Sequence, residues 1–329
     1  MNHSDSERIA AVLNNIGYRK AKCQKEADLI LANACSVRQT AIDRIWGQAQ
    51  NFAALKKKNK SLKTILTGCV LSKDKNKFRK IFDLILDIKD LPKLPNILNT
   101  KYKKQVSNDN YLKIKPSYQS SFIAYVPIMT GCNNFCSFCV VPYTRGREIS
   151  RKTKEILSEA KALINNGCKE IWLLGQNVNS YKDGKINFPK LLKKINGLPG
   201  SFWIRFTSSH PKPSTREKLG AGLVPHRNDV SGAGDFSWDE LIDTMAKSKK
   251  ITPYLNLPVQ SGDNKILKKM KRPYTVEKYK NIIKKIRKEI PNISLSTDII
   301  VGFPNETKKQ FQNTAKLLEE IKYDMAYIA

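Results

Sequence analysis

The 329-residue sequence lacks any long apolar run and contains only three histidines. No stretch approaches the roughly 18 apolar residues that a membrane-spanning helix needs, and segment 1–7 has no apolar centre of the kind found in secretion signals. His210 has no serine or cysteine partner in a recognisable nucleophile motif, so a hydrolytic triad is not supported. Because 40% of the residues are hydrophobic, the chain can bury a core, and these absences together predict a folded cytoplasmic protein.

Acidic residues are scarce relative to basic ones. The chain carries 59 Lys and Arg residues against 29 Asp and Glu residues, for a formal net charge of +30 at pH 7. A field of this size attracts polyanions, because neutralising phosphate groups releases their counterions. Nucleic acid is therefore the partner that the composition favours, and a solvated lysine-rich surface is the alternative.

Residues 1–90 alternate between helix and strand patterns. Apolar spacing predicts helices at 9–16 and 37–56 and strands at 27–32, 62–66 and 82–88. Cys35 and Cys69 come just after the first two of these strands. The pattern predicts an open α/β domain of the Rossmann or flavodoxin-like type, in which ligands bind at the carboxyl edge of the sheet.

A polar, proline-containing segment at 91–120 is expected to link this domain to a second α/β series over 121–329. Strand and helix patterns alternate along that series, which predicts a parallel sheet closed into a partial (β/α)6 barrel. The expected strands are 122–128, 170–175, 202–207, 253–257, 293–300 and 323–328, and the expected helices are 152–165, 187–196, 237–248, 264–270, 276–289 and 307–321. Residues 214–236, rich in glycine and polar side chains, are expected to form a long surface insertion.

Seven cysteines are present, and three of them, Cys132, Cys136 and Cys139, lie close together. The odd total of seven cysteines, the clustering of three of them and the polar N-terminus argue against a disulfide framework and favour metal or redox chemistry. Three thiolates on one short loop can hold three irons of a [4Fe–4S] cluster, and the open fourth iron suits S-adenosylmethionine (SAM) as a ligand. A structural zinc ion would need a fourth Cys or His, and Cys168, 29 residues further on, is read as a packing residue. The spacing therefore favours an iron–sulfur cluster.

Several longer blocks of sequence resemble one enzyme family. They are GCNNFCSFCVVPYTRGRE at 131–148, NACSVR at 33–38, LGQNVNSY at 174–181, RFTSSHP at 205–211, LPVQSG at 257–262 and DIIVGFPNET at 298–307. Together these blocks resemble the MiaB-type tRNA methylthiotransferases of the radical SAM superfamily. The resemblance covers nearly the whole chain apart from 214–236.

The resemblance implies an activity and two [4Fe–4S] clusters. The cluster on Cys132, Cys136 and Cys139 would reduce SAM to methionine and a 5′-deoxyadenosyl radical, which would remove the C2 hydrogen of adenosine 37 in tRNA bearing an N6-isopentenyl group. An auxiliary cluster, with Cys35 and Cys69 as two of its three ligands, would take part in sulfur insertion, and a further SAM would supply the methyl group. The implied partners are the anticodon arm of tRNA, an electron donor such as flavodoxin or ferredoxin, and a sulfur source, and the protein is expected to be a monomer.

The sequence also departs from the family pattern. The third cysteine of the auxiliary cluster would fall two residues before Met1, so that either translation starts further upstream or the protein has lost this ligand, and Cys23 is a less suitable substitute for it. The first strand of the N-terminal domain, the last barrel helix and the C-terminal RNA-binding TRAM domain are expected to be absent, and Asn256 stands where the family usually has histidine. These departures keep open a degenerate RNA-binding protein without turnover. A second alternative is the related family that methylthiolates an aspartate of a ribosomal protein, although the strings at 33–38 and 131–148 favour the tRNA branch.

Position along the expected barrel suggests which side chains contact cofactor and substrate. Barrel active sites form at the carboxyl ends of strands, which gives as SAM candidates Gln176, Asn177, Arg205, Thr207, Ser208, Gln260 and Ser261. Gly302 would shape the loop after the fifth strand, and Phe138 would pack against the nucleobase or fill core. A loop-capping hydrogen bond is the alternative for each polar candidate. Arg145, Arg147 and Arg151 suit substrate or phosphate contact, with surface ion pairs as the alternative.

Overall fold

The computed structural model describes residues 1–35, 39–98, 110–212 and 236–329. The chain forms two compact units, which are described separately. The first contains Met1–Gln119, Thr130–Asn133 and Cys139–Glu148, and the second contains the remaining described residues. No helix in the described part of the chain is both long and apolar enough to cross a membrane. The expected insertion at 214–236 lies almost wholly outside the described residues.

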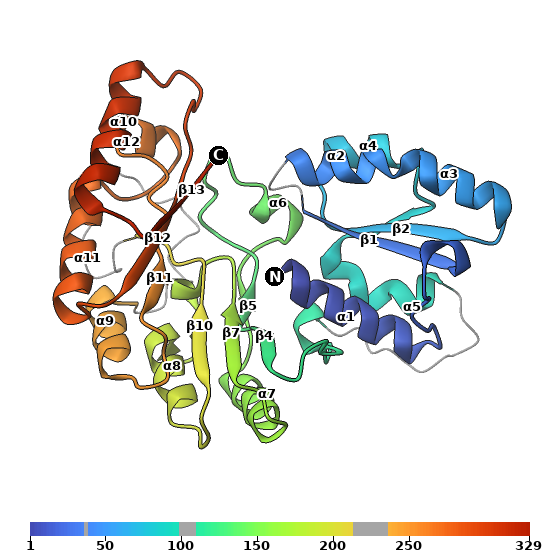
Figure 1. Ribbon diagram of the computed structural model, residues 1–329, viewed down its shortest axis with the longest axis horizontal. Helices are drawn as coiled ribbons and strands as arrows, with labels where there is room; N and C mark the ends of the chain where they lie inside the picture. Colours follow the sequence, from blue (N-terminus) through green and yellow to red (C-terminus); the bar gives the residue numbers. More distant parts are fainter. Residues whose placement is uncertain (36–38, 99–109, 213–235) are drawn as a thin grey trace. The chain divides into compact units, whose positions relative to one another are not determined.

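The first unit is built on a parallel sheet with the order β1–β2–β3. Its strands are β1 (Leu29–Cys35), β2 (Lys63–Cys69) and β3 (Leu84–Ile85), and its longer helices are α1 (Asn2–Asn15), α2 (Gln39–Gly47), α3 (Ala49–Lys58) and α4 (Ser72–Phe78). Successive residues of β2 point to opposite faces, so that Ile65 joins the core with α1 while Leu66 joins the core with α2, α3 and α4. Helices therefore cover both faces of the sheet (Figure 1), as the open α/β pattern predicts.

The expected linker at 91–120 was wrong for its described residues. The segment forms η2 (Ile88–Lys93), α5 (Leu94–Ile97) and η3 (Tyr111–Lys113), and the apolar residues Leu91, Leu94, Leu98, Tyr111 and Leu112 are buried against α1. The polar composition concealed this apolar stripe. The segment is thus part of the first unit. Three smaller differences are that α1 begins at Asn2, that β3 is two residues long, and that the expected helix at 37–56 is broken between α2 and α3.

The second unit is a partial barrel of parallel strands, which confirms the predicted fold class. Its strands are β4 (Ile123–Pro127), β7 (Glu170–Leu174), β10 (Trp203–Phe206), β11 (Tyr254–Asn256), β12 (Ser294–Ile299) and β13 (Met325–Ile328). The outer helices are α7 (Thr153–Asn165), α8 (Phe188–Asn196), α9 (Trp238–Lys247), α10 (Asn264–Lys269), α11 (Val276–Glu289) and α12 (Lys308–Ile321). Strands β4, β7 and β10 form one sheet and β11, β12 and β13 another, and a parallel bridge between Ile204 and Ile251 joins the two. Figure 1 shows these helices along the outside of the strands.

The connection from β11 to α10 is packed closely against α12. Asp263 caps α10 by accepting hydrogen bonds from the backbone N–H groups of Lys265 and Ile266, and it also accepts from the side chains of Gln310 and Asn313. Gly262 lies so near α12 that a Cβ there would be 2.6 Å from the Asn313 carbonyl oxygen. The close approach fixes the LPVQSG segment at the carboxyl end of β11.

We expect Gly262→Ala to destabilise the protein by about 2 kcal/mol, because the added methyl meets backbone atoms that cannot rotate away. The measurement is the urea midpoint of unfolding. Gly47→Ala at the end of α2 is the matched control, because a Cβ there has open space around it. Equal midpoints for the two variants would contradict the packing argument.

Candidate metal centres and a basic groove

Two cysteines lie together at the carboxyl edge of the first unit's sheet. Cys35 is the last residue of β1 and Cys69 the last residue of β2, and the two are paired in register. Gly68 lets the strands approach closely, since its φ is +102° and a Cβ there would be 2.1 Å from the Ala34 carbonyl oxygen. The structure therefore brings together the two thiols that the sequence analysis assigned to an auxiliary cluster, at the edge where open α/β sheets bind ligands.

A buried arginine contacts one of these thiols. Arg145 Nε donates a hydrogen bond to Cys69 Sγ at 3.1 Å, and its Nη1 donates to Asp5 Oδ1 at 3.3 Å. Asp5 is fully buried and also accepts a hydrogen bond from the Tyr111 hydroxyl. Burial raises the pKa of the Cys69 thiol, and the positive charge of Arg145 opposes that rise. Arg145 was expected to contact substrate or phosphate. Its guanidinium instead binds the Cys69 sulfur and the Asp5 carboxylate inside the protein.

The loop that carries Cys132, Cys136 and Cys139, here named the triad loop, has its two ends tied together within the first unit. Gly131 has φ +79°, and a Cβ there would be 2.0 Å from the Arg147 carbonyl oxygen. The Asn133 backbone N–H donates to Glu148 Oε1 at 3.3 Å, and the Glu148 backbone N–H donates to Asn133 Oδ1 at 3.2 Å. These reciprocal bonds close the loop that carries the three cysteines.

The middle of the loop, residues 134–138, belongs to the second unit. Phe135 has a left-handed backbone with φ +47°, and Cys136 is buried. Arg272 Nη1 donates to Cys136 Sγ at 3.7 Å, within reach for a bond to sulfur. Arg272 is a site residue that the sequence analysis missed, because one arginine among 59 basic residues carries no local signal.

The donors of the loop suit a thiolate-bound iron–sulfur cluster. Such clusters use cysteine sulfurs, and hydrogen bonds to those sulfurs tune them. Cys132 and Cys136 are buried, and Cys139 is half-buried. Within the described ranges, however, no three side chains of the Cys, His, Asp or Glu type gather closely enough to hold one metal ion. The structure thus places three suitable donors on one anchored loop without drawing them to a common point.

Polar atoms without protein partners follow two barrel strands. In the part of the chain that the structure describes, buried atoms that make no hydrogen bond include Gln176 Oε1, Asn177 Oδ1, Asn179 Oδ1, Ser209 Oγ and His210 Nε2. His210 Nδ1 accepts a hydrogen bond from the backbone N–H of Lys212 at 3.0 Å, and burial holds the His210 pKa well below its usual value. The neutral ring therefore carries its proton on Nε2, as a donor. Donors and acceptors of this kind suit a polar ligand at the carboxyl ends of β7 and β10.

Other candidates have partners inside the protein. Arg205 forms an ion pair with Glu170 at 3.0 Å, and Arg151 pairs with Glu159 at 2.6 Å. The Ser261 hydroxyl lies 3.3 Å from Thr314 Oγ1, which is a loop-capping contact. The remaining candidates differ in exposure, with Gln260 buried, Phe138, Thr207 and Ser208 half-buried, and Arg147 and Gly302 exposed.

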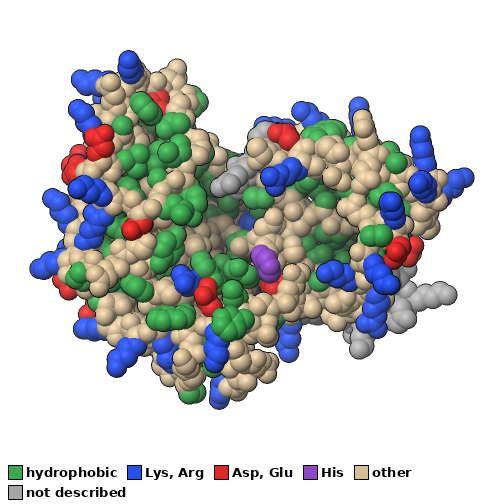
Figure 2. Space-filling model, viewed as in Figure 1, with side chains coloured by type: hydrophobic (Ala, Val, Ile, Leu, Met, Phe, Trp, Pro, Cys, Tyr) green, Lys and Arg blue, Asp and Glu red, His purple; other side chains and the backbone are tan. Residues whose placement is uncertain are grey.

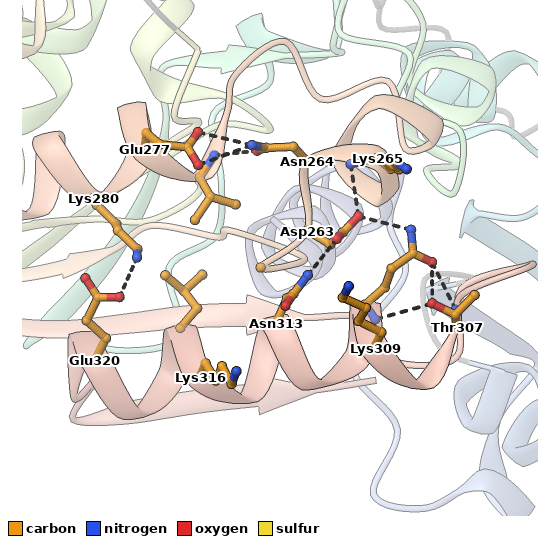
Figure 3. Close-up of a pocket in the computed structure, with 14 residues that line it drawn as sticks. Asp263, Asn264, Lys265, Glu277, Lys280, Thr307, Lys309, Asn313, Lys316 and Glu320 are labelled. Carbon is orange, nitrogen blue, oxygen red and sulfur yellow. Dashed lines mark hydrogen bonds and ion pairs between the residues drawn. The ribbon is translucent and has the colours of Figure 1, made fainter.

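A groove of about 760 Å³ lies between α10, α11 and α12 in the second unit. Its carboxylates are engaged, since Glu277 accepts from Asn264 and Glu320 pairs with Lys280, while Asp263 caps α10. Lys265, Lys309 and Lys316 also line it, as Figure 3 shows, and all three are exposed. On the face seen in Figure 2, Lys and Arg side chains are scattered rather than gathered in one patch. The net charge alone therefore does not locate a nucleic-acid surface.

Comparisons with known proteins agree with these features. Residues 126–318 match the Radical SAM superfamily, and residues 1–87 match a family described as Uncharacterized protein family UPF0004. The radical SAM methyltransferase TsrM from Kitasatospora setae has a TM-score of 0.61 at 13% identity, over 98% of this chain and 66% of that one. The cobalamin-dependent SAM radical enzyme OxsB has a TM-score of 0.58 at 12% identity, over 99% of this chain and 50% of that one. At these identities the likeness concerns the fold alone, and the sequence match defines the class as radical SAM.

Curated relatives narrow the class. The chain is 41% identical to the tRNA-2-methylthio-N(6)-dimethylallyladenosine synthase of Clostridium botulinum strain Langeland, over 99% of this chain and 71% of the relative. It is 40% identical to the synthase of the same name from Carboxydothermus hydrogenoformans, over 99% of this chain and 73% of the relative. The chain therefore belongs to the family of tRNA-2-methylthio-N(6)-dimethylallyladenosine synthases, which are radical SAM methylthiotransferases. The resemblance found in the sequence blocks is confirmed.

We expect Arg145→Met to lower the free energy of unfolding by about 3–5 kcal/mol, because it removes the arginine of the buried ion pair with Asp5 and leaves that carboxylate with hydrogen bonding from Tyr111 alone among its side-chain contacts described above. The double variant Asp5→Asn with Arg145→Met should recover part of the loss. Urea denaturation of the full chain measures both effects. Lys285→Met, which removes an exposed ion pair with Asp239, is the control and should leave the midpoint unchanged. An Arg145→Met midpoint equal to that of the control would contradict the assignment.

Proposed function

We propose that the protein converts N6-isopentenyladenosine 37 of tRNA to its 2-methylthio derivative in the cytoplasm. The observation that carries the proposal is the 41% identity to the Clostridium botulinum synthase over 99% of this chain. The relatives bear the tRNA reaction in their names, which favours tRNA over a ribosomal-protein aspartate. The reaction also needs a flavodoxin- or ferredoxin-type electron donor and a sulfur source, and we propose that the chain acts as a monomer.

Cys132, Cys136 and Cys139 are the proposed ligands of the SAM-binding [4Fe–4S] cluster. When bound, this cluster with SAM supplies the 5′-deoxyadenosyl radical that removes the C2 hydrogen of the adenine. The chain's own contribution is to keep Cys132 and Cys136 away from solvent and to hold the loop closed through Asn133 and Glu148. Solvent exposure is one of the factors that set the reduction potential of an iron–sulfur cluster. The burial of these two cysteines would therefore influence the potential of a cluster bound here.

The unpartnered polar atoms after β7 and β10 are the proposed SAM contacts. Gln176 and Asn177 offer acceptors for amino or ribose hydroxyl groups, and Ser209 and His210 offer donors for a carboxylate. A buried polar atom without a partner costs about 1–3 kcal/mol, so a ligand that satisfies several of them is bound favourably. Arg205 and Ser261 are proposed to hold their loops through the partners that they already have. Direct contact remains a prediction for Phe138, Thr207, Ser208, Gln260 and Gly302.

Cys35 and Cys69 are proposed as two ligands of an auxiliary [4Fe–4S] cluster that takes part in sulfur insertion. Their pairing in register at the ends of β1 and β2 supports the assignment. Arg145 would stabilise the thiolate form of Cys69 through its hydrogen bond.

The groove between α10, α11 and α12 is a proposed contact for the tRNA backbone. Lys265, Lys309 and Lys316 have no carboxylate partner among the described residues, whereas the acidic side chains of the groove are engaged. Exposed ammonium groups of this kind bind phosphates as point charges. Arg147 remains a candidate for substrate contact.

Replacing Cys132, Cys136 and Cys139 together by Ala should abolish cleavage of SAM to 5′-deoxyadenosine, because no cluster can then present an open iron. The assay is anaerobic reconstitution with dithionite, followed by chromatography and mass spectrometry of the nucleoside product. Cys23→Ala, at an exposed thiol, is the control and should retain cleavage. Cleavage that persists in the triple variant would remove the basis for the proposed function.

The variant Lys265→Ala, Lys309→Ala and Lys316→Ala should weaken binding of an anticodon-arm RNA. The slope of log K against log salt should fall by about 1 for each lysine that contacts a phosphate. The control, Lys57→Ala with Lys58→Ala and Lys60→Ala, removes the same charge from exposed positions of the first unit. Binding is measured by fluorescence anisotropy between about 50 and 200 mM salt, because the affinity of a protein that contacts phosphates falls steeply over roughly this range. Equal slopes for both variants would exclude the groove as the contact.

A further inference from the structure

The turn after α10 contains a buried arginine that the proposed function does not yet use. Arg272 is 8% exposed. Besides its contact with Cys136 Sγ at 3.7 Å, its Nη2 donates to the Pro258 carbonyl at 2.7 Å and its Nε donates to the Tyr274 hydroxyl at 2.8 Å. Two neutral oxygen atoms thus fix the guanidinium, and its remaining hydrogen-bond contact is with a cysteine sulfur.

The charge of Arg272 has no carboxylate partner among the described residues. The side chains that it contacts are the Tyr274 hydroxyl and the Cys136 sulfur, and the ring of His210 faces the same tyrosine ring at 5.8 Å between centroids. A buried cation is strongly unfavourable unless an anion accompanies it. The available anion is the Cys136 sulfur, as a thiolate that ligates a metal.

The same turn also holds the backbone of the triad loop. The Ser137 backbone N–H donates to the Met270 carbonyl at 3.1 Å, and the Ser137 hydroxyl donates to the Lys269 carbonyl at 3.0 Å. Lys271 has a left-handed backbone with φ +55°, which ends the helix at this point. Residues 269–272, the clamp turn, therefore bind the cysteine loop through its backbone and through Arg272.

We propose that Arg272 is a positioning residue that fixes the Cys136 sulfur and raises the reduction potential of the SAM-binding cluster by placing beside it a positive charge that no carboxylate neutralises. Net charge and hydrogen bonds to the sulfurs both set such potentials. When bound at the three cysteines, a cluster would gain one negative charge on accepting an electron from a flavodoxin- or ferredoxin-type donor. A neighbouring cation stabilises that reduced form, so reduction becomes easier. The inference rests on the proposed function, because it requires the cluster to be bound at the triad.

The test compares Arg272→Lys, Arg272→Gln and Arg272→Met with the parent chain, all carrying Cys35→Ala and Cys69→Ala so that only the triad cluster remains. Iron and sulfide per chain are measured after reconstitution, and the midpoint potential is measured by a redox titration followed by electron paramagnetic resonance. Arg287→Gln on the outer helix α11, where the arginine donates to the Lys322 carbonyl, is the matched control. Gln keeps amide donors and loses the charge, whereas Lys keeps the charge.

We expect Arg272→Gln and Arg272→Met to make one-electron reduction at least tenfold less favourable, a fall of about 59 mV, while Arg272→Lys and the control stay near the parent value. A Gln variant with the parent potential, or a Lys variant as low as Gln, would overturn the inference and leave the proposed function standing. If Arg272→Met does not fold, the comparison of Gln with Lys decides the same question. A parent chain that binds no cluster would overturn both proposals.

Discussion

A hydrogen bond from a buried guanidinium to a cysteine sulfur is the interaction on which both candidate centres depend. Arg145 reaches Cys69 in the first unit, and Arg272 reaches Cys136 in the second. A cationic donor favours the thiolate, which is the form that binds metal. Each arginine is also fixed by oxygen atoms, so the position of each sulfur follows from the fold around the arginine. The loops and strand ends that carry the cysteines are arranged around these two contacts.

The two contacts differ in how their charge is balanced. Arg145 is paired with the buried Asp5 carboxylate, so its charge is largely neutralised and its main effect is to join three distant segments of the first unit. Arg272 has neutral oxygen partners and a sulfur. Its positive charge is therefore felt by whatever is bound at Cys136. Arg145 therefore acts mainly by fixing the position of the Cys69 sulfur. Arg272 fixes the position of the Cys136 sulfur and also exerts an electric field on a group bound there.

Local sequence patterns predicted the strands well, because parallel strands are buried on both faces and appear as short apolar runs. They also placed Cys35 and Cys69 at neighbouring strand ends, which the register of β1 and β2 confirms. The partners of the cysteines could not be predicted this way. Arg272 is separated from Cys136 by 136 residues and Arg145 from Cys69 by 76, and no local pattern encodes such pairs. The prediction of a linker at 91–120 was wrong for a related reason. The few leucines of its described part form an apolar surface only because they pack against α1.

The basic composition connects the three proposed ligands of the chain. A formal charge of +30 makes every further buried cation less favourable and every bound anion more favourable. A thiolate-bound cluster, the carboxylate of SAM and the phosphates of RNA are all anions. The field that draws RNA to the surface therefore also favours the anionic groups inside. Specificity must come from elsewhere, since a field does not distinguish one anion from another. It is supplied at short range by fixed donors such as Arg272 and His210, whose orientations are set by hydrogen bonds to the backbone.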